Sequence, residues 1–341
     1  MNLKLLKKLC DTPGMPGGED LIRDLVIDEY KKFTKDITTD AMGNVIAHIK
    51  GSGPRLVVDA HMDEVGFMVH HIDDKGFIRL TPMGGVDPRV YYAQRLVVWG
   101  KKPLVGMVAA IPPHISKSGN NKEVPEIEDC VVDVGLPASK VKKLVKVGDF
   151  VSFDSELVET EDSVISKALD DRMGLFVIIE ALSKKPKINC DLFITATVQE
   201  ESGLRGARLI TPVVGPDFVI ALEGTVAMDV PGIPADKSLA NTNKGPEIRL
   251  SDRYLIADRK FSLYITELAK KKRIPSQITV KKAGGTNATA MQVTGKGSRA
   301  AVISVPTRYL HSPSSIAYKK DINHTINLVS AVLSDIKNFK N

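Results

Sequence analysis

The sequence predicts an α/β fold: a mixed, largely parallel sheet flanked by helices and interrupted by an inserted, small β-barrel-like domain. Three observations predict it. The 341 residues exceed the roughly 250–300 at which a single core usually divides. Apolar strands alternate with helices at both ends of the chain, a pattern typical of parallel sheets covered on both faces. Between them lies a stretch of short, β-branched runs. We therefore assign residues 1–65 and 161–341 to one α/β domain and residues 66–160 to an inserted β-rich domain.

The first α/β segment is predicted to contain one helix and one buried strand. Leu21, Leu25 and Tyr30 fall at helical spacing within residues 18–34, where acidic residues come early and lysines late, as the helix dipole favours. The short apolar run at residues 55–60 is typical of a buried strand.

The insert is predicted to be almost entirely β-structure. Its apolar runs GFMVHHI, GFIRLTP, RLVVWG, VGMVAAI and DFVSF are short, rich in β-branched residues and separated by Gly, Pro and Asp. The one helical pattern there covers residues 138–146.

The second α/β segment returns to alternating strands and helices. Its final helix is the clearest, because Ile322, Ile326, Val329, Leu333 and Ile336 recur at steps of four and three residues and form one apolar face. The other expected elements are a buried helix at residues 173–184, a strand at 191–199, a short helix near 204–210, a strand at 217–222, an amphipathic helix at 258–273, and strands at 277–280 and 299–305.

Composition and charge exclude several classes of protein. With 43% hydrophobic residues and charges of both signs, the chain is too apolar to be disordered. The 47 basic and 41 acidic residues leave a net charge of only +6, so we expect no nucleic-acid or membrane partner. No apolar stretch is long enough for a signal sequence or a membrane-spanning helix. The three cysteines are odd in number and far apart, so we expect no disulfide framework and a cytoplasmic protein.

Acids and histidines stand at the ends of five apolar runs, which is where open α/β sheets bind their ligands. Each one alone has an ordinary explanation: a lone histidine at a strand end is usually structural, and paired acids before a helix usually complement its dipole. The combination fits this explanation poorly, because carboxylates directly after apolar runs would be costly if buried without partners. The residues concerned are His61 and Asp63, Asp170 and Asp171, Glu200 and Glu201, Glu223, and His311.

These residue types suit a pair of metal ions. Two imidazoles and several carboxylates favour Zn²⁺ or Co²⁺, and each ion needs about four ligands, with one position left open for water at a catalytic site. Five side chains would hold two ions if Asp170 bridges them, and a sixth carboxylate outside the ligand set could accept a proton from a shared water. The five are His61, Asp170, Glu201, Glu223 and His311.

Five motifs in this order and spacing, HMDEVGF, KALDDRMG, TVQEESGLRGA, ALEGT and PTRYLHSP, resemble the cobalt- or zinc-dependent aminopeptidases of metallopeptidase family forty-two. This tetrahedral (TET) group includes glutamyl and leucyl aminopeptidases, and some of its members carry an endoglucanase label. The likeness covers nearly the whole chain and includes TPGMPGGED, GGVDPRV and GGTNATAMQ. It implies a zinc-peptidase-like fold, two Zn or Co ions per subunit, and hydrolysis of N-terminal residues from short peptides by a water that bridges the ions.

The resemblance also implies a role for each matching residue. His61 would bind one ion, with Glu201 completing its set, and His311 would bind the other. Asp170 would bridge both, and the peptide between it and Asp171 is expected to be cis. The remaining assignments are Glu223 as the fifth ligand, Glu200 as the general base, and Asp63 as the residue that orients the His61 ring.

Two positions depart from the family's pattern. Glu223 stands where the family usually has Asp, which lengthens an oxygen ligand by one methylene group. Asn287 replaces the Asp of the family's GGTD motif, so a charge is lost there. The resemblance further implies a homo-oligomer, often a dodecameric shell built from dimers, in which the insert caps the site and helps assembly. It does not indicate which N-terminal residue is preferred.

Other functions fit the sequence less well. In a glycoside hydrolase of the endoglucanase type, Glu200 and Glu201 would serve as acid and nucleophile, but adjacent residues at a strand end point to opposite faces rather than toward each other. The chain also has a single tryptophan for stacking on sugars. A binding protein without activity leaves the ligand set unexplained, and a metal-dependent deacylase or carboxypeptidase would share the chemistry. The other histidines are expected to be structural or exposed: His48, His70, His71, His114 and His324.

Overall fold

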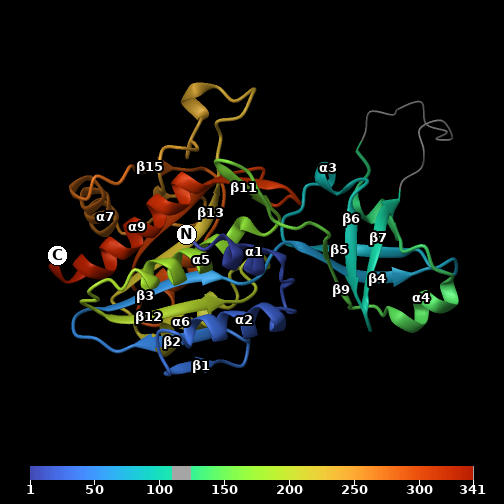
Figure 1. Ribbon diagram of the computed structural model, residues 1–341, viewed down its shortest axis with the longest axis horizontal. Coiled ribbons are helices and arrows are strands. Elements are labelled where there is room, and N and C mark those ends of the chain that lie inside the picture. Colours follow the sequence, from blue (N-terminus) through green and yellow to red (C-terminus); the bar gives the residue numbers. More distant parts are fainter. Residues whose placement is uncertain (110–123, 341) are drawn as a thin grey trace.

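The computed structural model describes residues 1–109 and 124–340, which form two β-structures (Figure 1). One is an 11-stranded sheet with helices on both faces, and the other is a closed barrel of six strands. The predicted fold class is therefore confirmed. His114 and the end of the apolar run at residues 105–111 lie outside the described residues.

Four parallel strands form the centre of the large sheet, so their carboxyl ends meet at one edge. The register sets His61 opposite Thr197, which places the first candidate ligand at that edge. In spatial order the four strands are β12 (Asp191–Thr197), β3 (Arg55–His61), β13 (Phe218–Val226) and β16 (Arg299–Arg308).

Shorter strands complete the sheet on both sides. All of them are two to five residues long, and only β15 among them was predicted. β1 and β2 lie beside β12, while β17, β11 and β10 follow β16; β14 pairs antiparallel with β16 and parallel with β15. Their bounds are β1 (Ile37–Thr39), β2 (Val45–Ile49), β10 (Val158–Glu159), β11 (Ser163–Ser166), β14 (Glu247–Ser251), β15 (Gln277–Val280) and β17 (Ser315–Tyr318).

Each face of the sheet has its own apolar core, because successive side chains of a strand point to opposite faces. On β3, Leu56 and Val58 enter one core and Val57 enters the other. The first core is covered by α1 (Leu3–Asp11), α2 (Asp20–Tyr30), α5 (Leu169–Ser183), α7 (Arg259–Lys271) and α9 (Lys319–Asp335), and the second by α6 (Ala207–Val214) and α8 (Asn287–Val293).

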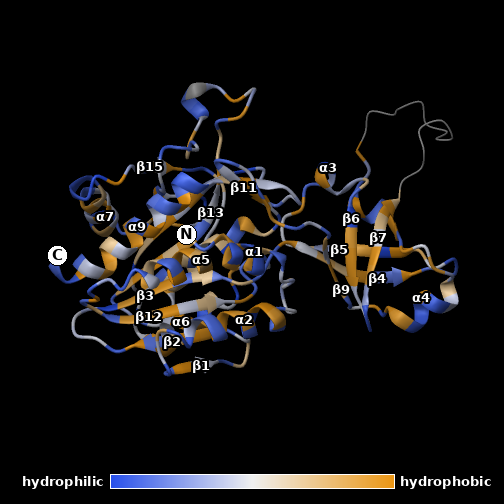
Figure 2. Cartoon of the chain, viewed as in Figure 1, coloured by the Kyte–Doolittle hydropathy of each residue, from blue (hydrophilic) through white to orange (hydrophobic). Residues whose placement is uncertain are grey.

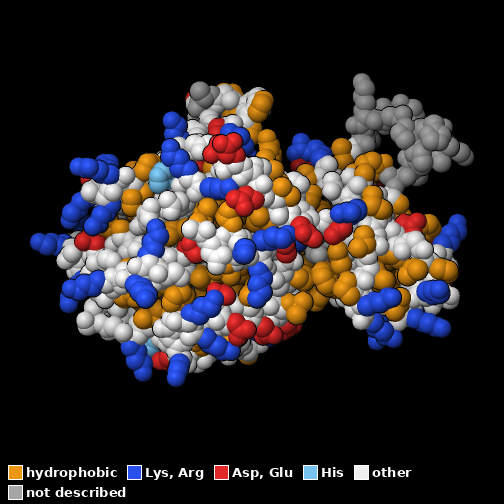
Figure 3. Space-filling view, viewed as in Figure 1, with side chains coloured by type: hydrophobic (Ala, Val, Ile, Leu, Met, Phe, Trp, Pro, Cys, Tyr) orange, Lys and Arg blue, Asp and Glu red, His pale blue; other side chains and the backbone are white. Residues whose placement is uncertain are grey.

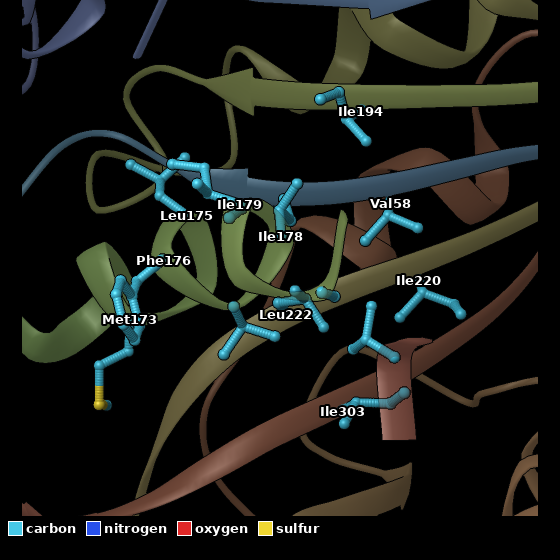
Figure 4. Packing of buried hydrophobic residues seen from close by; sticks show 14 of the residues in the cluster. Val58, Met173, Leu175, Phe176, Ile178, Ile179, Ile194, Ile220, Leu222 and Ile303 are labelled. Carbon is cyan, nitrogen blue, oxygen red and sulfur yellow. The ribbon is translucent and has the colours of Figure 1, made fainter. Parts of the chain in front are cut away.

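Helix α5 lies at the centre of the larger core and begins at the edge of the sheet where the parallel strands end. Helix α5 packs on β3, β13 and β16, and its Phe176 and Ile179 share one buried cluster with Val58, Ile220 and Ile303 of those strands (Figure 4). Full burial of such side chains contributes about 1.5–3 kcal/mol each. The helix start is therefore fixed relative to the strand ends. The apolar face predicted for the last helix is also buried throughout.

The barrel has a separate core and no free edge, since β4 pairs with both β5 and β9. Its core includes Phe67 and Phe153, whose ring centroids are 5.4 Å apart. The strands follow the order β4 (Gly66–Ile72), β5 (Ile78–Met83), β8 (Val131–Asp133), β7 (Pro103–Ala109), β6 (Arg95–Trp99) and β9 (Phe150–Phe153). Two helices, α3 (Pro88–Tyr91) and α4 (Ala138–Leu144), lie between these strands in the sequence. The 3-10 helices of the described chain are η2 (Ile127–Asp129), η3 (Ala235–Lys237) and η4 (Ile336–Asn338).

Apolar residues concentrate on the strands and on the helix faces that meet them (Figure 2). Lysine and arginine side chains are spread over the visible surface rather than gathered in one patch (Figure 3). Within the described ranges, no helix is both long enough and apolar enough to cross a bilayer.

Candidate metal centre

The five predicted metal ligands converge at the carboxyl edge of the parallel strands. His61 ends β3, Asp170 stands at the start of α5, Glu201 lies in the turn after β12, and His311 follows β16. Glu223 lies within β13, which runs past its predicted end to Val226. Residues separated by up to 250 positions in the sequence are thus brought within a few ångströms of one another.

Asp170 lies between the two histidines with one oxygen toward each. Its Oδ1 is 3.5 Å from His61 Nε2 and its Oδ2 is 3.6 Å from His311 Nε2. The backbone N–H of Gly224 donates to Oδ1 at 3.0 Å, which fixes the carboxylate. The peptide joining Asp170 to Asp171 is cis, as the resemblance implied. With one oxygen toward each histidine, the Asp170 carboxylate is placed as a ligand that bridges two metal ions would be.

The two glutamate ligands, Glu201 and Glu223, lie near different histidines, and for Glu201 this is not the histidine that we expected. Glu201 Oε1 lies 3.1 Å from His311 Nε2, whereas Glu223 Oε2 lies 3.7 Å from His61 Nε2. The sequence-based assignment had placed Glu201 with His61. The reason for the difference is the turn after β12, which directs Glu201 toward His311 and leaves Glu200 facing His61, with Glu200 Oε2 4.0 Å from His61 Nε2.

The two histidine rings are each oriented by a backbone carbonyl. His61 Nδ1 lies 3.0 Å from the carbonyl oxygen of Asp63, and His311 Nδ1 lies 2.9 Å from that of Gly85. Because a carbonyl oxygen can only accept, Nδ1 carries a proton in both rings, and Nε2 is the ring atom directed at the carboxylates. The Asp63 carboxylate is also near the first ring, with Oδ1 3.4 Å from Nδ1.

The Gly85 contact comes from the barrel, so the insert takes part in the site. Gly84 precedes it at φ +86°, and a Cβ there would lie 2.9 Å from Val65 and 3.1 Å from the Cβ of Glu201. Glycine allows this backbone to approach Glu201 and His311 closely. Sequence reasoning missed the contact, although GGVDPRV belongs to the family resemblance.

Asp63 holds the turn that carries the two glutamates. Its Oδ1 accepts a hydrogen bond from the N–H of Glu200 and its Oδ2 accepts one from the N–H of Glu201, both at 3.0 Å. The carboxylate is fully buried. Asp171 is likewise buried and bonded to backbone, accepting from the N–H groups of His61 and Gly174.

The cluster concentrates negative charge away from water. Burial raises the pKa values of Glu200, Glu223 and Asp171 well above their usual range, and neighbouring carboxylates add to the effect while the charge of His61 opposes it. Burial alone would lower the pKa of His61, but the hydrogen bond with Asp170 and further carboxylates raise it. Divalent cations would neutralise the negative charge of these carboxylates.

The donor geometry also fits divalent ions. Ligand atoms about 2.1 Å from one tetrahedral ion lie about 3.4 Å apart, and the nitrogen–oxygen distances named above run from 3.1 to 3.7 Å. Among the described residues, three groups place their ligand atoms within 4.8 Å of one another: His61 with Asp171 and Glu223, His61 with Glu200 and Glu201, and Asp170 with Glu201 and His311.

A second layer of polar contacts, which sequence reasoning missed, supports the ligands. The amide nitrogen of Asn287 donates to Asp59 Oδ2 at 2.9 Å and to the hydroxyl of Thr197 at 2.7 Å. Its backbone N–H donates to Glu223 Oε1 at 3.3 Å. A usable signal existed for Asp59, because it stands two residues before His61 and therefore points to the same face of the strand.

Comparison with known proteins agrees with this geometry. The family model described as M42 glutamyl aminopeptidase matches residues 43–328. The lysyl aminopeptidase of Pyrococcus furiosus is 35% identical, covering 98% of this chain and 97% of that protein.

Two solved structures share the fold over nearly their whole length. An aminopeptidase from Desulfurococcus kamchatkensis superposes with a TM-score of 0.94 at 35% identity, covering 99% of this chain and 97% of the other. The TET1 peptidase of Pyrococcus horikoshii, which can assemble into a tetrahedron or a large octahedral shell, gives 0.87 at 32% identity over 97% and 98%. The chain therefore belongs to the M42 peptidase family and is a hydrolase of peptide bonds.

Proposed function

We propose that this metal-dependent aminopeptidase removes N-terminal residues from short peptides by means of two divalent ions. His61 and Glu223 would hold one ion, Glu201 and His311 the other, and Asp170 both. The observation that carries the proposal is the position of Asp170, whose two oxygens lie 3.5 and 3.6 Å from the Nε2 atoms of the two histidines. Zn²⁺ and Co²⁺ suit this set of imidazole and carboxylate donors.

Glu200 is the proposed general base. When bound, the ions would lower the pKa of a shared water and polarise the scissile carbonyl. Glu200 faces His61 but is not needed in the ligand set, so its carboxylate is free to accept the proton of the attacking water. The same group then returns the proton to the leaving amine.

Selection for N-termini would follow from the charge of the site. A free α-amine can be held by one ion and by the surplus carboxylates of the cluster, whereas an internal peptide nitrogen cannot use them in this way. The preferred side chain at the N-terminus is a separate property, set by loops around the site.

We assign catalysis to residues 1–65 and 161–341, and capping and assembly to the insert at residues 66–160. The proposed state is a homo-oligomer of the TET type, a dodecamer built from dimers. Two observations support it: the assemblies of the P. horikoshii relative, and the side chains Val105 and Met107, which expose 56% and 44% of their surface on the barrel. A cytoplasmic location is proposed because the three cysteines are all buried, unpaired thiols.

An activity assay with removal and return of metal tests the function. Leucyl, glutamyl and lysyl anilides are offered beside carboxymethylcellulose, after treatment with a chelator and again after addition of Zn²⁺ or Co²⁺. Anilide cleavage that stops with the chelator and returns with metal is expected. Cellulose cleavage that survives Glu200→Gln would instead establish a glycoside hydrolase. Elemental analysis is expected to find up to two metal ions per chain.

A further inference from the structure

Three successive backbone N–H groups in the turn after β12 point at buried carboxylates. Glu200 and Glu201 donate to Asp63, as described above. The preceding N–H, that of Gln199, donates at 3.1 Å to Oε1 of Glu19, a residue 180 positions earlier in the chain. The turn that carries the general base is therefore held from two separate segments.

The turn has a conformation that needs such support. Gln199 has φ +55°, in the left-handed region that residues with a side chain rarely adopt. The chain reverses there, with the N–H of Arg205 bonded to the carbonyl of Gln199 at 3.1 Å. Without support, the backbone of this turn could adopt other conformations. Each of them would point the Glu200 side chain in a different direction.

The Glu19 side chain is not used to cap its own helix. It stands at the N-cap of α2, but its side chain makes no capping hydrogen bond with that helix. Only 5% of its surface is exposed. Burial raises its pKa to about 7, the charge of Asp63 adds to the shift, and the N–H groups of Gly17 and Gln199 oppose it. A buried carboxylate needs hydrogen-bond donors, and the turn supplies the one donor that lies far from Glu19 in the sequence, the N–H of Gln199.

The loop that presents Glu19 is fixed against the barrel. A Cβ on Gly18 would lie 2.6 Å from the ring of Phe150 in β9, so the loop backbone packs directly on that ring. Glu19 therefore lies between the insert, which its loop contacts at Phe150, and the turn that carries Glu200.

We infer that Glu19 is a positioning residue for the general base: by accepting the N–H of Gln199 it sets the direction in which Glu200 leaves the strand. Among the described residues, the side-chain hydrogen bond found for Glu19 is to Gln199 and not to a proposed metal ligand. The inference rests on the proposed role of Glu200 and extends it to a residue of the N-terminal loop.

Full-length variants at position 19 test the inference. Glu19→Gln keeps an oxygen that can accept from Gln199, whereas Glu19→Ala removes it and Glu19→Asp withdraws it by one methylene group. Since a misplacement of about 1 Å can cost on the order of 100-fold in rate, kcat of the Ala and Asp variants is expected to fall at least about tenfold. KM and metal content should stay near wild type, and Glu19→Gln should retain kcat within about threefold. Asp20→Ala, an exposed neighbour, is the matched control.

Hydrogen exchange of the backbone amides of residues 199–201 gives a readout that does not depend on activity. Faster exchange in the Ala and Asp variants, and wild-type exchange in Glu19→Gln, are expected. Wild-type kcat together with unchanged exchange in Glu19→Asp would overturn the inference, and so would a loss of kcat in Glu19→Gln equal to that in Glu19→Ala. If the wild-type protein cleaves no peptide, the proposed function fails, while the exchange result still decides whether Glu19 holds the turn.

Discussion

At position 287, the buried Asp59 carboxylate favours a side chain that can donate a hydrogen bond. Asp59, which Asn287 contacts, is fully buried, and burial raises the pKa of Asp59 to about 6 against the opposing hydrogen bonds from Thr195, Asn287 and Thr197. A carboxylate can only accept hydrogen bonds. The amide of Asn287 supplies a donor that the Asp of the family's usual motif could supply only when protonated.

The exchange Asn287→Asp is therefore expected to destabilise the protein. It would set two buried carboxylates about a hydrogen-bond length apart, so one must take up a proton or remain unsatisfied, at a cost of about 1–3 kcal/mol. Urea unfolding at pH 8 measures the loss, which should shrink at pH 5, where one carboxyl is protonated. Asn323→Asp, at an exposed position of α9, serves as the control; equal stability of wild type and Asn287→Asp at pH 8 would contradict this account.

Glu200→Gln should separate catalysis from metal binding. The amide is isosteric but cannot accept a proton, so we expect kcat to fall by about 10²- to 10⁴-fold with metal content unchanged. Glu201→Gln, its neighbour, should instead lose metal, because it removes a charged ligand. Activity and elemental analysis of the two variants check this. Loss of metal from Glu200→Gln and its retention in Glu201→Gln would reverse the assigned roles.

At the scale of elements, a buried ionic cluster supports β14 and β15, which join the sheet through the pairing of β14 with β16. Glu247 on β14 accepts from Arg249 at 3.1 Å and lies 3.0 Å from Lys281, which follows β15. Thr225 of β13 also bonds to both cations. Burial alone would raise the pKa of Glu247, but the charges of Arg249 and Lys281, with further hydrogen bonds, lower it to about 2.

This cluster predicts a pH dependence of stability. Because the folded pKa of Glu247 lies below its ordinary value of 4.5, the ionised form favours folding; the stabilisation is complete above pH 4.5 and is lost as the pH falls toward 2. The difference corresponds to about 3 kcal/mol. Glu247→Gln should lower the free energy of unfolding at pH 7 by about that amount and flatten its decline below pH 4.5. An unchanged slope in this variant would count against the cluster.

Which elements could be predicted depended on whether their stability is local. β3, β13, β16, α5 and α9 carry long apolar runs or one clear apolar face, and these were predicted with small errors at their ends. α1 was missed although Leu5, Leu6 and Leu9 give it a buried apolar face. α8 and the short strands of the large sheet other than β15 were missed because their sequences of two to seven residues carry weak signals of their own. Their conformation is set by the strand or helix on which each one packs.

The site was predictable in its residue types but not in its internal geometry. Histidines and acids at strand ends indicated the ligands, since parallel strands bring their carboxyl ends together. The pairing of Glu201 with His311 depends on the left-handed turn at Gln199, which no periodicity reveals. The contributions of Glu19 and Gly85 come from loops whose course is set only when the barrel and the sheet pack together.

For the whole molecule, assembly is the property that can be measured most directly. Sedimentation velocity is expected to show a particle of about twelve chains of 37.1 kDa, in line with the TET relatives. If the apolar residues of the barrel form contacts between subunits, Val105→Asp together with Met107→Asp should yield smaller particles. Lys142→Glu, a charged change on the same insert, is the control. A native monomer would rule the proposed assembly out.

The carbonyl of Gly85 has a consequence for how such a protein can diverge. Since the insert orients one of the two histidines, its loop after β5 cannot drift or be exchanged independently of the catalytic part. A barrel grafted from a distant relative would have to bring a backbone of the same course to the same place. The position of the His311 ring therefore depends on the insert as well as on the sheet, although the barrel has a core of its own.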